Sequence, residues 1–227
     1  MSNCYLKASC NGKDCDTFCI RKYKMDSLYS AALITDSQKQ HIALRVDADG
    51  TDLEQFKQLA GIEQNICKFI EEGKNLYLHS AIPGNGKSSW SLRLVEAYFN
   101  KIWARSEPKC RALFISVPRF LLALKDNITN KSSYIEYIKE NVLDADLVVW
   151  DDVAAKNAGT DFELTNLLSI IDNRLALGKS NIYTSNLNRQ QLYNVLGERL
   201  TSRIANMSID IELFGSDKRN LKLEDSQ

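Results

Sequence analysis

Residues 81–88 read Ala-Ile-Pro-Gly-Asn-Gly-Lys-Ser, and this stretch decides the fold. It follows an apolar run at 75–79 that is typical of a short buried strand, and it leads into residues 90–99, where apolar side chains recur at helical spacing. A strand, a glycine-containing loop ending in Gly-Lys-Ser and a helix together predict a phosphate-binding Walker A loop. Ala81 stands where the full pattern has glycine, a mild departure because that position needs a compact residue.

The loop suits phosphate because glycine lets the backbone come close to an anion at a helix N-terminus. Lys87 is expected to reach the β- and γ-phosphates of a nucleotide, and the Ser88 hydroxyl is expected to bind Mg²⁺. The alternative is a chance glycine-rich turn before a helix. The expected nucleotide-binding residues of the loop are Pro83, Gly84, Asn85, Gly86, Lys87, Ser88 and Ser89.

A second apolar run, residues 146–150, ends in Asp151 and Asp152. An apolar strand that ends in two acids is typical of Walker B, the other half of a nucleotide site. Asp151 is the expected nucleotide-site ligand of Mg²⁺, through water, and Asp152 is the expected group that polarises the attacking water. Two solvated acids at a strand end are the alternative, which the Walker A loop in the same chain disfavours.

Residues 180–186 predict another strand, which ends in small polar residues. Asn188 and Gln191 have the spacing of a helix-capping pair, so Asn186 has no capping role and is free to face the γ-phosphate.

Three arginines follow this strand. Arg199 and Arg203 are four residues apart in the next helix and share a face, and Arg219 comes after a last strand at 209–213. For each of them, a surface ion pair is the alternative to a role in catalysis.

Strands alternate with helical segments along the chain. Residues 111–117 are also strand-like, and residues 52–59 and 62–70 are helical. This alternation predicts an α/β fold with a parallel sheet flanked by crossover helices. The length of 227 residues suits one such domain with a small appendage, and 44% apolar residues are enough for a sizeable core.

The composition excludes a strong overall attraction to nucleic acid or to membranes. The 29 basic and 29 acidic residues give a formal net charge of zero, so DNA binding would have to be local. Apolar runs fall short of membrane-spanning length and the N-terminus has no secretory core, so we expect a cytoplasmic protein without a membrane partner.

Four of the six cysteines lie near the N-terminus: Cys4, Cys10, Cys15 and Cys19. In a reducing compartment this density favours a metal over disulfides, and four thiolates complete a tetrahedral Zn²⁺ site. The spacing lacks the usual Cys-x-x-Cys pair. Unligated thiols in a flexible tail are therefore the alternative.

Four motifs in this order resemble the AAA+ ATPases of the DnaC/DnaI helicase-loader group, which are often phage-encoded. They are the Walker A loop at 84–88, the Walker B strand at 147–152, Tyr-Thr-Ser-Asn-Leu at 183–187 and Leu-Gly-Glu-Arg-Leu-Thr-Ser-Arg at 196–203. The resemblance covers residues from about 50 to about 220. It implies an AAA+ P-loop core that hydrolyses ATP with Mg²⁺.

The same resemblance implies roles for single residues. Asn186 would be sensor 1, Arg203 an arginine finger acting on a neighbouring subunit, and Arg219 a sensor 2 residue that contacts nucleotide. With Asp152, the expected catalytic residues are then Asp152, Asn186 and Arg203. Because the sequence ends soon after Arg219, the helical lid of larger AAA+ proteins is expected to be missing.

The partners implied are a replicative DNA helicase, single-stranded DNA and further copies of the chain in a homo-oligomer. Residues 118–140 lie where such loaders carry an extra helix that meets DNA. Arg119, Lys125 and Lys131 would supply positive charge there. Phe120 would supply a stacking face, although it fits a core-facing stripe equally well.

We therefore expect an ATP-dependent helicase loader in DNA replication. An IstB-like transposition-helper ATPase shares the core motifs and remains an alternative, as does a non-hydrolysing adaptor that uses zinc and nucleotide structurally. A small-molecule P-loop kinase is disfavoured because Asn186 and Arg203 would have no evident role. The expected domains are an N-terminal zinc-binding module at 1–27, a helical connection at 28–50 and an AAA+ ATPase domain at 51–227.

Overall fold

The computed structural model describes residues 4, 6, 10, 18–39, 50–105, 107, 109–127, 131–154 and 160–218. Within them, five strands form one sheet in the order β2-β3-β4-β1-β5, with every neighbouring pair parallel. The strands are β1 (Asn75–His79), β2 (Ala112–Ser116), β3 (Leu147–Asp151), β4 (Ser180–Ser185) and β5 (Ile209–Glu212). The predicted parallel sheet is confirmed, strand by strand.

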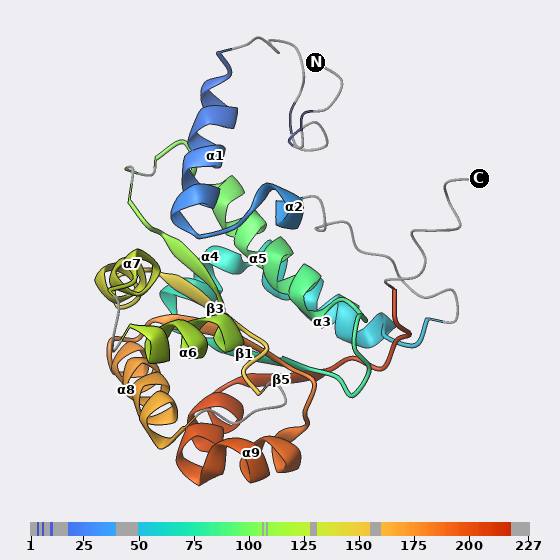
Figure 1. Ribbon diagram of the computed structural model, residues 1–227. Coiled ribbons are helices and arrows are strands. Elements are labelled where there is room, and N and C mark those ends of the chain that lie inside the picture. Colours follow the sequence, from blue (N-terminus) through green and yellow to red (C-terminus); the bar gives the residue numbers. More distant parts are fainter. Residues whose placement is uncertain are drawn as a thin grey trace, which may run out of the picture.

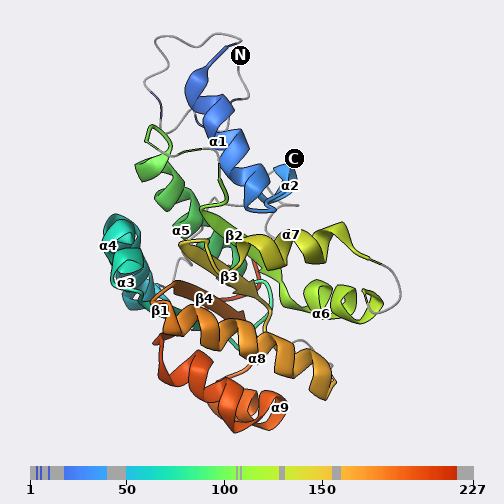
Figure 2. The ribbon, with the colours of Figure 1, turned by 90° about the vertical axis from the view of Figure 1, so that its left-hand side faces the viewer.

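Helices cover both faces of the sheet, which makes three layers (Figures 1 and 2). One face carries α1, α3, α4 and α5, and the other carries α6, α7, α8 and α9. The bounds of the helices are α1 (Ile20–Ala31), α2 (Asp36–Lys39), α3 (Leu53–Gln64), α4 (Ile66–Glu71), α5 (Lys87–Ile102), α6 (Val117–Asp126), α7 (Ser133–Asn141), α8 (Asp161–Ala176) and α9 (Arg189–Thr201), which continues into a π-helical turn, Ser202–Asn206.

Strand β1 shows why the middle of a central strand is apolar on both faces. Successive side chains of a strand point to opposite faces, so Leu76 and Leu78 pack under α3, α4 and α5 while Tyr77 packs under α8 and α9. Both faces are covered by helices, and all five residues of β1 are buried. A parallel strand in this position needs apolar side chains on both sides, as the run at 75–79 predicts.

A buried arginine joins α8 to the sheet. Arg174 is fully buried, and its guanidinium donates to Asn181 Oδ1 (2.7 Å) and to the carbonyls of Val142 (2.5 Å), Ala145 (2.9 Å) and Ser180 (2.6 Å). Burial lowers the pKa of Arg174 to about 10. The five donors of a guanidinium in a fixed fork allow one side chain to satisfy this many carbonyls.

Helix α1 is attached to the edge strand β2. The backbone N–H of Phe114 donates to the Ala32 carbonyl (2.9 Å), and the Tyr137 hydroxyl donates to the Ala31 carbonyl (2.7 Å). Met25 and Tyr29 of α1 lie in the core. The boundary predicted between residues 27 and 28 falls inside this helix, and residues 40–49 of the predicted connection lie outside the described residues.

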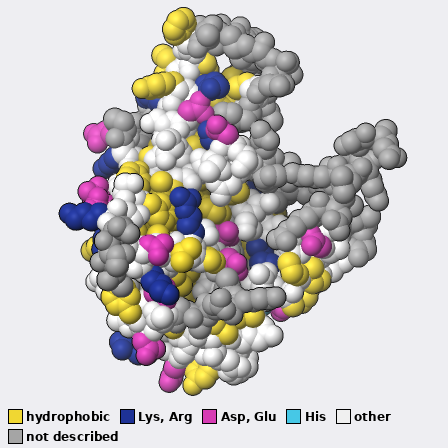
Figure 3. Space-filling view, in the orientation of Figure 1, with side chains coloured by type: hydrophobic (Ala, Val, Ile, Leu, Met, Phe, Trp, Pro, Cys, Tyr) yellow, Lys and Arg dark blue, Asp and Glu magenta, His cyan; other side chains and the backbone are white. Residues whose placement is uncertain are grey.

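On the face shown in Figure 3, basic and acidic side chains are interspersed among apolar and neutral ones. This mixture agrees with the formal net charge of zero. Every helix in the described part of the chain is too short or too polar to cross a membrane.

Candidate nucleotide-binding site

Three strand ends meet where the Walker motifs were predicted. Strand β4 pairs with β1 on one side and with β3 on the other, so the carboxyl ends of these three strands are adjacent. The N–H of Ser80, at the start of the loop after β1, donates to the carbonyl of Ser185 at the end of β4 (3.2 Å). In open parallel α/β sheets, ligands bind at the carboxyl ends of the strands.

The loop after β1 has the backbone of an anion site. Gly84 and Gly86 have φ values of 76° and 108°, which glycine adopts without the strain of a Cβ. Gly86 is the N-cap of α5 and has no side chain to occupy the free N–H groups of the first turn. These N–H groups and the helix dipole favour a negatively charged ligand at this end of α5.

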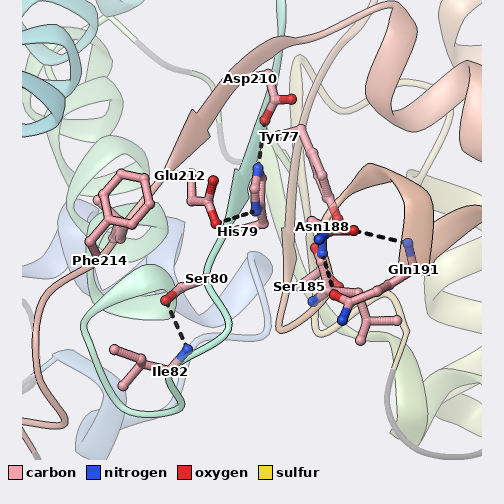
Figure 4. A network of polar contacts seen from close by, with 12 residues as sticks. Tyr77, His79, Ser80, Ile82, Ser185, Asn188, Gln191, Asp210, Glu212 and Phe214 are labelled. Atoms are coloured by element: carbon pink, nitrogen blue, oxygen red, sulfur yellow. Dashed lines mark hydrogen bonds and ion pairs between the residues drawn. The ribbon is translucent and has the colours of Figure 1, made fainter.

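Lys87 is held inside this loop. Its side chain is almost buried, and its ammonium donates to the Ile82 carbonyl (3.2 Å) and to Asn85 Oδ1 (3.3 Å). The Asn85 amide in turn donates to Ser80 Oγ (2.5 Å), and the Ile82 N–H donates to the same hydroxyl oxygen (3.1 Å; Figure 4). A buried ammonium gains from an anion beside it, so the loop and the lysine suit a phosphate group.

The two Walker motifs are linked through one carboxylate oxygen. Ser88 Oγ donates to Asp151 Oδ1 (2.7 Å), and Thr184 Oγ1 donates to the same oxygen (2.7 Å). The Thr184 hydroxyl also accepts from the N–H of Asp152 (2.9 Å). A serine hydroxyl and a carboxylate side by side are the oxygen ligands that Mg²⁺ prefers, so these residues fit the metal of a nucleotide site.

Asp152 lies at the turn that follows β3 and has a left-handed backbone with φ 59°. Non-glycine residues are uncommon there, and they persist where the surrounding structure fixes them. Burial and the neighbouring Asp151 carboxylate raise the pKa of Asp152, while Lys87 opposes this rise. A raised pKa improves a carboxylate as a proton acceptor.

Asn186 follows β4 directly and is half-buried. Asn188 and Gln191 form the reciprocal cap of α9, since each side chain accepts from the backbone N–H of the other residue (2.9 Å in both cases; Figure 4). The predicted capping pair is confirmed. Asn186 therefore lies at the carboxyl end of the sheet, together with Asp151 and the P-loop, and has no role in the cap.

Arg203 lies in the π-helical turn after α9 and is half-exposed. Its Nε donates to Asp172 Oδ1 of α8 (2.5 Å). This is the intrachain ion pair that the sequence left open as an alternative. Because both side chains reach the surface, the pair is partly hydrated and weaker than a buried one. Arg199 is exposed one turn earlier, after a kink at Gly197.

Two sets of predicted binding residues, those for nucleotide and those for zinc, lie only partly within the described residues. Arg219 and Cys15 lie outside the described residues. Cys4 packs against the core, Cys10 is exposed, and Cys19 caps α1 by accepting from the Lys22 N–H (3.4 Å). In the part of the chain that the structure describes, His, Cys, Asp and Glu side chains form no cluster that would hold a metal ion, so the zinc prediction gains no support.

Within the described residues, the predicted DNA segment at 118–140 contains most of helices α6 and α7. Phe120 is fully buried and packs edge-on against Trp150 (ring centroids 6.4 Å apart), so its proposed role as a stacking face for a base is wrong. The residue serves the core because its helix must cover the sheet. Arg119, Lys125 and Lys131 are exposed, and the Arg119 guanidinium lies over the Tyr134 ring (4.5 Å).

Sequence reasoning missed three polar residues at or near the site. Thr184 joins Asp151 to Asp152, Asp172 holds Arg203, and His79 at the end of β1 contacts Asp210 of β5 (Nε2 to Oδ1, 2.9 Å; Figure 4). All four contacts join residues more than thirty positions apart in the sequence. Thr184 directly precedes Ser185 and Asn186 at the end of the predicted strand, and this position was the signal that could have found it.

Fold and site together place a phosphate-binding loop and a Walker B aspartate side by side at the carboxyl end of a five-stranded parallel sheet. Three solved structures share the fold. The DnaC helicase loader has a TM-score of 0.58 at 22% identity, covering 72% of this chain and 90% of that one. DnaI has a TM-score of 0.56 at 19% identity, covering 80% of this chain and 93% of that one. AMPPCP-bound DnaA from Aquifex aeolicus has a TM-score of 0.56 at 20% identity, covering 76% of this chain and 49% of that one.

In sequence, the chain is similar to the replicative helicase loader DnaC. It is 26% identical to DnaC of Escherichia coli strain K12 over 140 residues, which are 62% of this chain and 51% of that protein. The chain thus spans about half the length of the curated relatives it matches. No protein-family model matches it. The resemblance to DnaC/DnaI-type proteins that the motifs indicated is confirmed.

Proposed function

We propose that this chain is an ATP-dependent helicase loader in DNA replication, which binds single-stranded DNA and a replicative helicase. The observation that carries the proposal is the contact of Ser88 with Asp151, which brings the two Walker motifs into one site. The homology to DnaC supports the loader role and favours it over a transposition helper.

At this site, the loop N–H groups and Lys87 would hold the β- and γ-phosphates, and Ser88 with Asp151 would hold Mg²⁺. The metal, when bound, would supply charge neutralisation for the transferred phosphoryl group. Asp152 accepts the proton of the attacking water, for which its raised pKa suits it. Asn186, directly after β4, would face the γ-phosphate from the neighbouring strand end.

Hydrolysis in this proposal takes place between subunits. Arg203 is half-exposed and held by an ion pair on the surface, so a neighbouring nucleotide can compete for it. A guanidinium that reaches the γ-phosphate of an adjacent subunit stabilises the charge of the transition state. ATP binding then orders a homo-oligomer, and hydrolysis releases the helicase.

Nucleotide binding and turnover test the core of the proposal. Lys87→Ala is expected to abolish tight binding of a fluorescent ATP analogue, because it removes the cation in the loop. Asp152→Asn is expected to bind normally and to lose most turnover, because an amide does not accept the proton. Lys68→Ala, an exposed lysine on α4, is the control for lost charge.

Unchanged affinity of Lys87→Ala would contradict the Walker A assignment. Turnover of Asp152→Asn at the parental rate would remove Asp152 as the base. Wild-type protein that binds ATP and never hydrolyses it, with or without DNA, would favour the adaptor. Capture of the helicase from the native host, identified by mass spectrometry, tests the partner.

Binding of single-stranded DNA is proposed for the exposed basic residues Arg119, Lys125 and Lys131. Arg119→Ala is expected to weaken binding of labelled single-stranded DNA and to reduce its salt dependence, because a phosphate contact releases counterions. Lys57→Ala on α3 is the matched control, since it removes an exposed charge on a different helix. Equal effects of the two substitutions would place the DNA elsewhere.

A zinc site in the N-terminal module rests on sequence alone. Four thiolates within nineteen residues would bind one Zn²⁺ per chain and order the module, which would contact the helicase. Metal analysis of protein purified without chelator tests this, with Cys15→Ser as the variant. Protein without stoichiometric zinc would end the zinc proposal and leave the ATPase proposal unaffected.

A further inference from the structure

The chain folds back over its own phosphate-binding loop after β5. We call residues 213–218 the strap. It runs from the end of β5 past the N-terminus of α3 and alongside the loop after β1 (Figure 1). The Leu213 N–H donates to the His79 carbonyl (2.8 Å), which continues the β1–β5 pairing by one residue.

A buried carboxylate fixes the start of the strap. Asp52 is only 1% exposed, and instead of capping α3 its carboxylate accepts from the N–H groups of Phe214 (2.7 Å) and Gly215 (2.8 Å). Bonds to an ionised acceptor are among the stronger hydrogen bonds in proteins. The path of the strap is therefore specified by Asp52.

The other end of the strap lies on the P-loop. The Lys218 N–H donates to the Gly84 carbonyl (3.1 Å), and the Lys218 ammonium lies over the Phe56 ring (5.2 Å). Between these anchors, the Asp217 carboxylate occupies the space that a side chain at Gly84 would fill. A Cβ built on Gly84 would stand 1.9 Å from Asp217 Oδ1.

A carboxylate thus lies against a loop that is built to attract anions. The loop N–H groups, the start of α5 and Lys87 favour negative charge near Gly84. Asp217 and a phosphate group are both negatively charged, so Asp217 repels a phosphate that comes close. Because Asp217 is exposed, it can leave the loop without unfolding the sheet.

We propose that the strap is an autoinhibitory element, whose Asp217 carboxylate competes with the phosphates of an incoming nucleotide at Gly84. Nucleotide binding displaces Asp217 from the loop, and the strap between Phe214 and Lys218 moves with it. The proposal rests on the proposed function, because it needs a nucleotide at this loop.

The test compares nucleotide affinity among single variants of the full chain. Asp217→Asn keeps the size of the side chain and removes its charge, whereas Asp217→Ala removes both. Both are expected to bind a fluorescent ATP analogue about five-fold more tightly than wild type, the scale of one charge at a helix N-terminus. Glu136→Gln, which removes an exposed charge on α7, controls for net charge and is expected to bind like wild type.

Hydrogen exchange gives a second measurement that does not depend on affinity. Saturating nucleotide is expected to speed exchange at the Lys218 amide in wild type, because its bond to the Gly84 carbonyl is lost when the strap leaves the loop. Asp217 variants with unchanged or weaker affinity would overturn the proposal, as would a Lys218 amide that becomes more protected. Failure of every protein, wild type included, to bind nucleotide would instead refute the nucleotide site and remove the strap's role with it.

Discussion

Thr184→Val tests whether the link between the two Walker motifs holds the site together. Thr184 is 2% exposed, and valine has nearly the same shape. The substitution removes the bond that the hydroxyl donates to Asp151 (2.7 Å) and the one that it accepts from the Asp152 N–H (2.9 Å). A bond to a charged group contributes about 2 kcal/mol and a neutral one about 1 kcal/mol. We therefore expect about 3 kcal/mol less stability.

The matched control is Thr201→Val. Thr201 is 4% exposed, and its hydroxyl has no hydrogen-bond partner among the described residues. Replacing such a hydroxyl by a methyl group of the same shape is expected to change stability by less than about 0.5 kcal/mol or to increase it.

Urea unfolding at pH 7, followed by circular dichroism, gives both free energies. The reasoning is refuted if the two variants lose the same stability, or if Thr184→Val unfolds within about 0.5 kcal/mol of wild type. A loss confined to Thr184→Val would show that the hydroxyl, and not the packing of a buried threonine, stabilises this edge of the sheet.

Three further predictions concern single side chains. Burial raises the pKa of Asp152 above its unfolded value, so the stabilising contribution of this carboxyl is complete below the unfolded pKa and is lost as pH rises through the folded pKa. Over that rise in pH, the urea midpoint of Asp152→Asn should increase relative to that of wild type. Parallel plots of midpoint against pH for the two proteins would contradict the prediction. Mixed assemblies of Arg203→Ala and Lys87→Ala subunits should recover ATP turnover, since the lesions lie on opposite sides of one shared site, whereas assembled but inactive mixtures would place Arg203 within its own chain. Arg174→Lys should cost about 3 kcal/mol in urea unfolding, because an ammonium cannot satisfy the carbonyls that the guanidinium fork reaches, and a loss below about 1 kcal/mol would show that those carbonyls find other partners.

The sheet could be predicted from sequence because its signals are local. Strands β1, β2 and β3 are short runs rich in apolar residues, and the helix after the P-loop begins at the lysine that the motif marks. The capping pair of α9 was equally local, since Asn188 and Gln191 are three residues apart. The Walker residues could be placed at one edge because parallel strands end on the same side.

What could not be predicted depends on contacts between distant segments. Asp52 looks like a helix cap, and only the folded chain shows that its carboxylate holds residues 214 and 215. Phe120 belongs to a helix whose burial is decided by α8 and β3, so its exposure could not be read from the charges around it. Asp172 finds Arg203 across 31 residues, a pairing that spacing does not encode.

The end of α1 also changes what the edges of the sheet can do. An open edge strand is a template for pairing with another chain, and such pairing leads to aggregation. At the β2 edge, the Ala32 carbonyl already occupies the N–H of Phe114. At the other edge, β5 has four residues, and the Asp210 and Glu212 side chains are partly exposed carboxylates. The end of α1 therefore occupies part of the β2 edge and disfavours strand-to-strand pairing there, which is a different contact from the assembly proposed through Arg203.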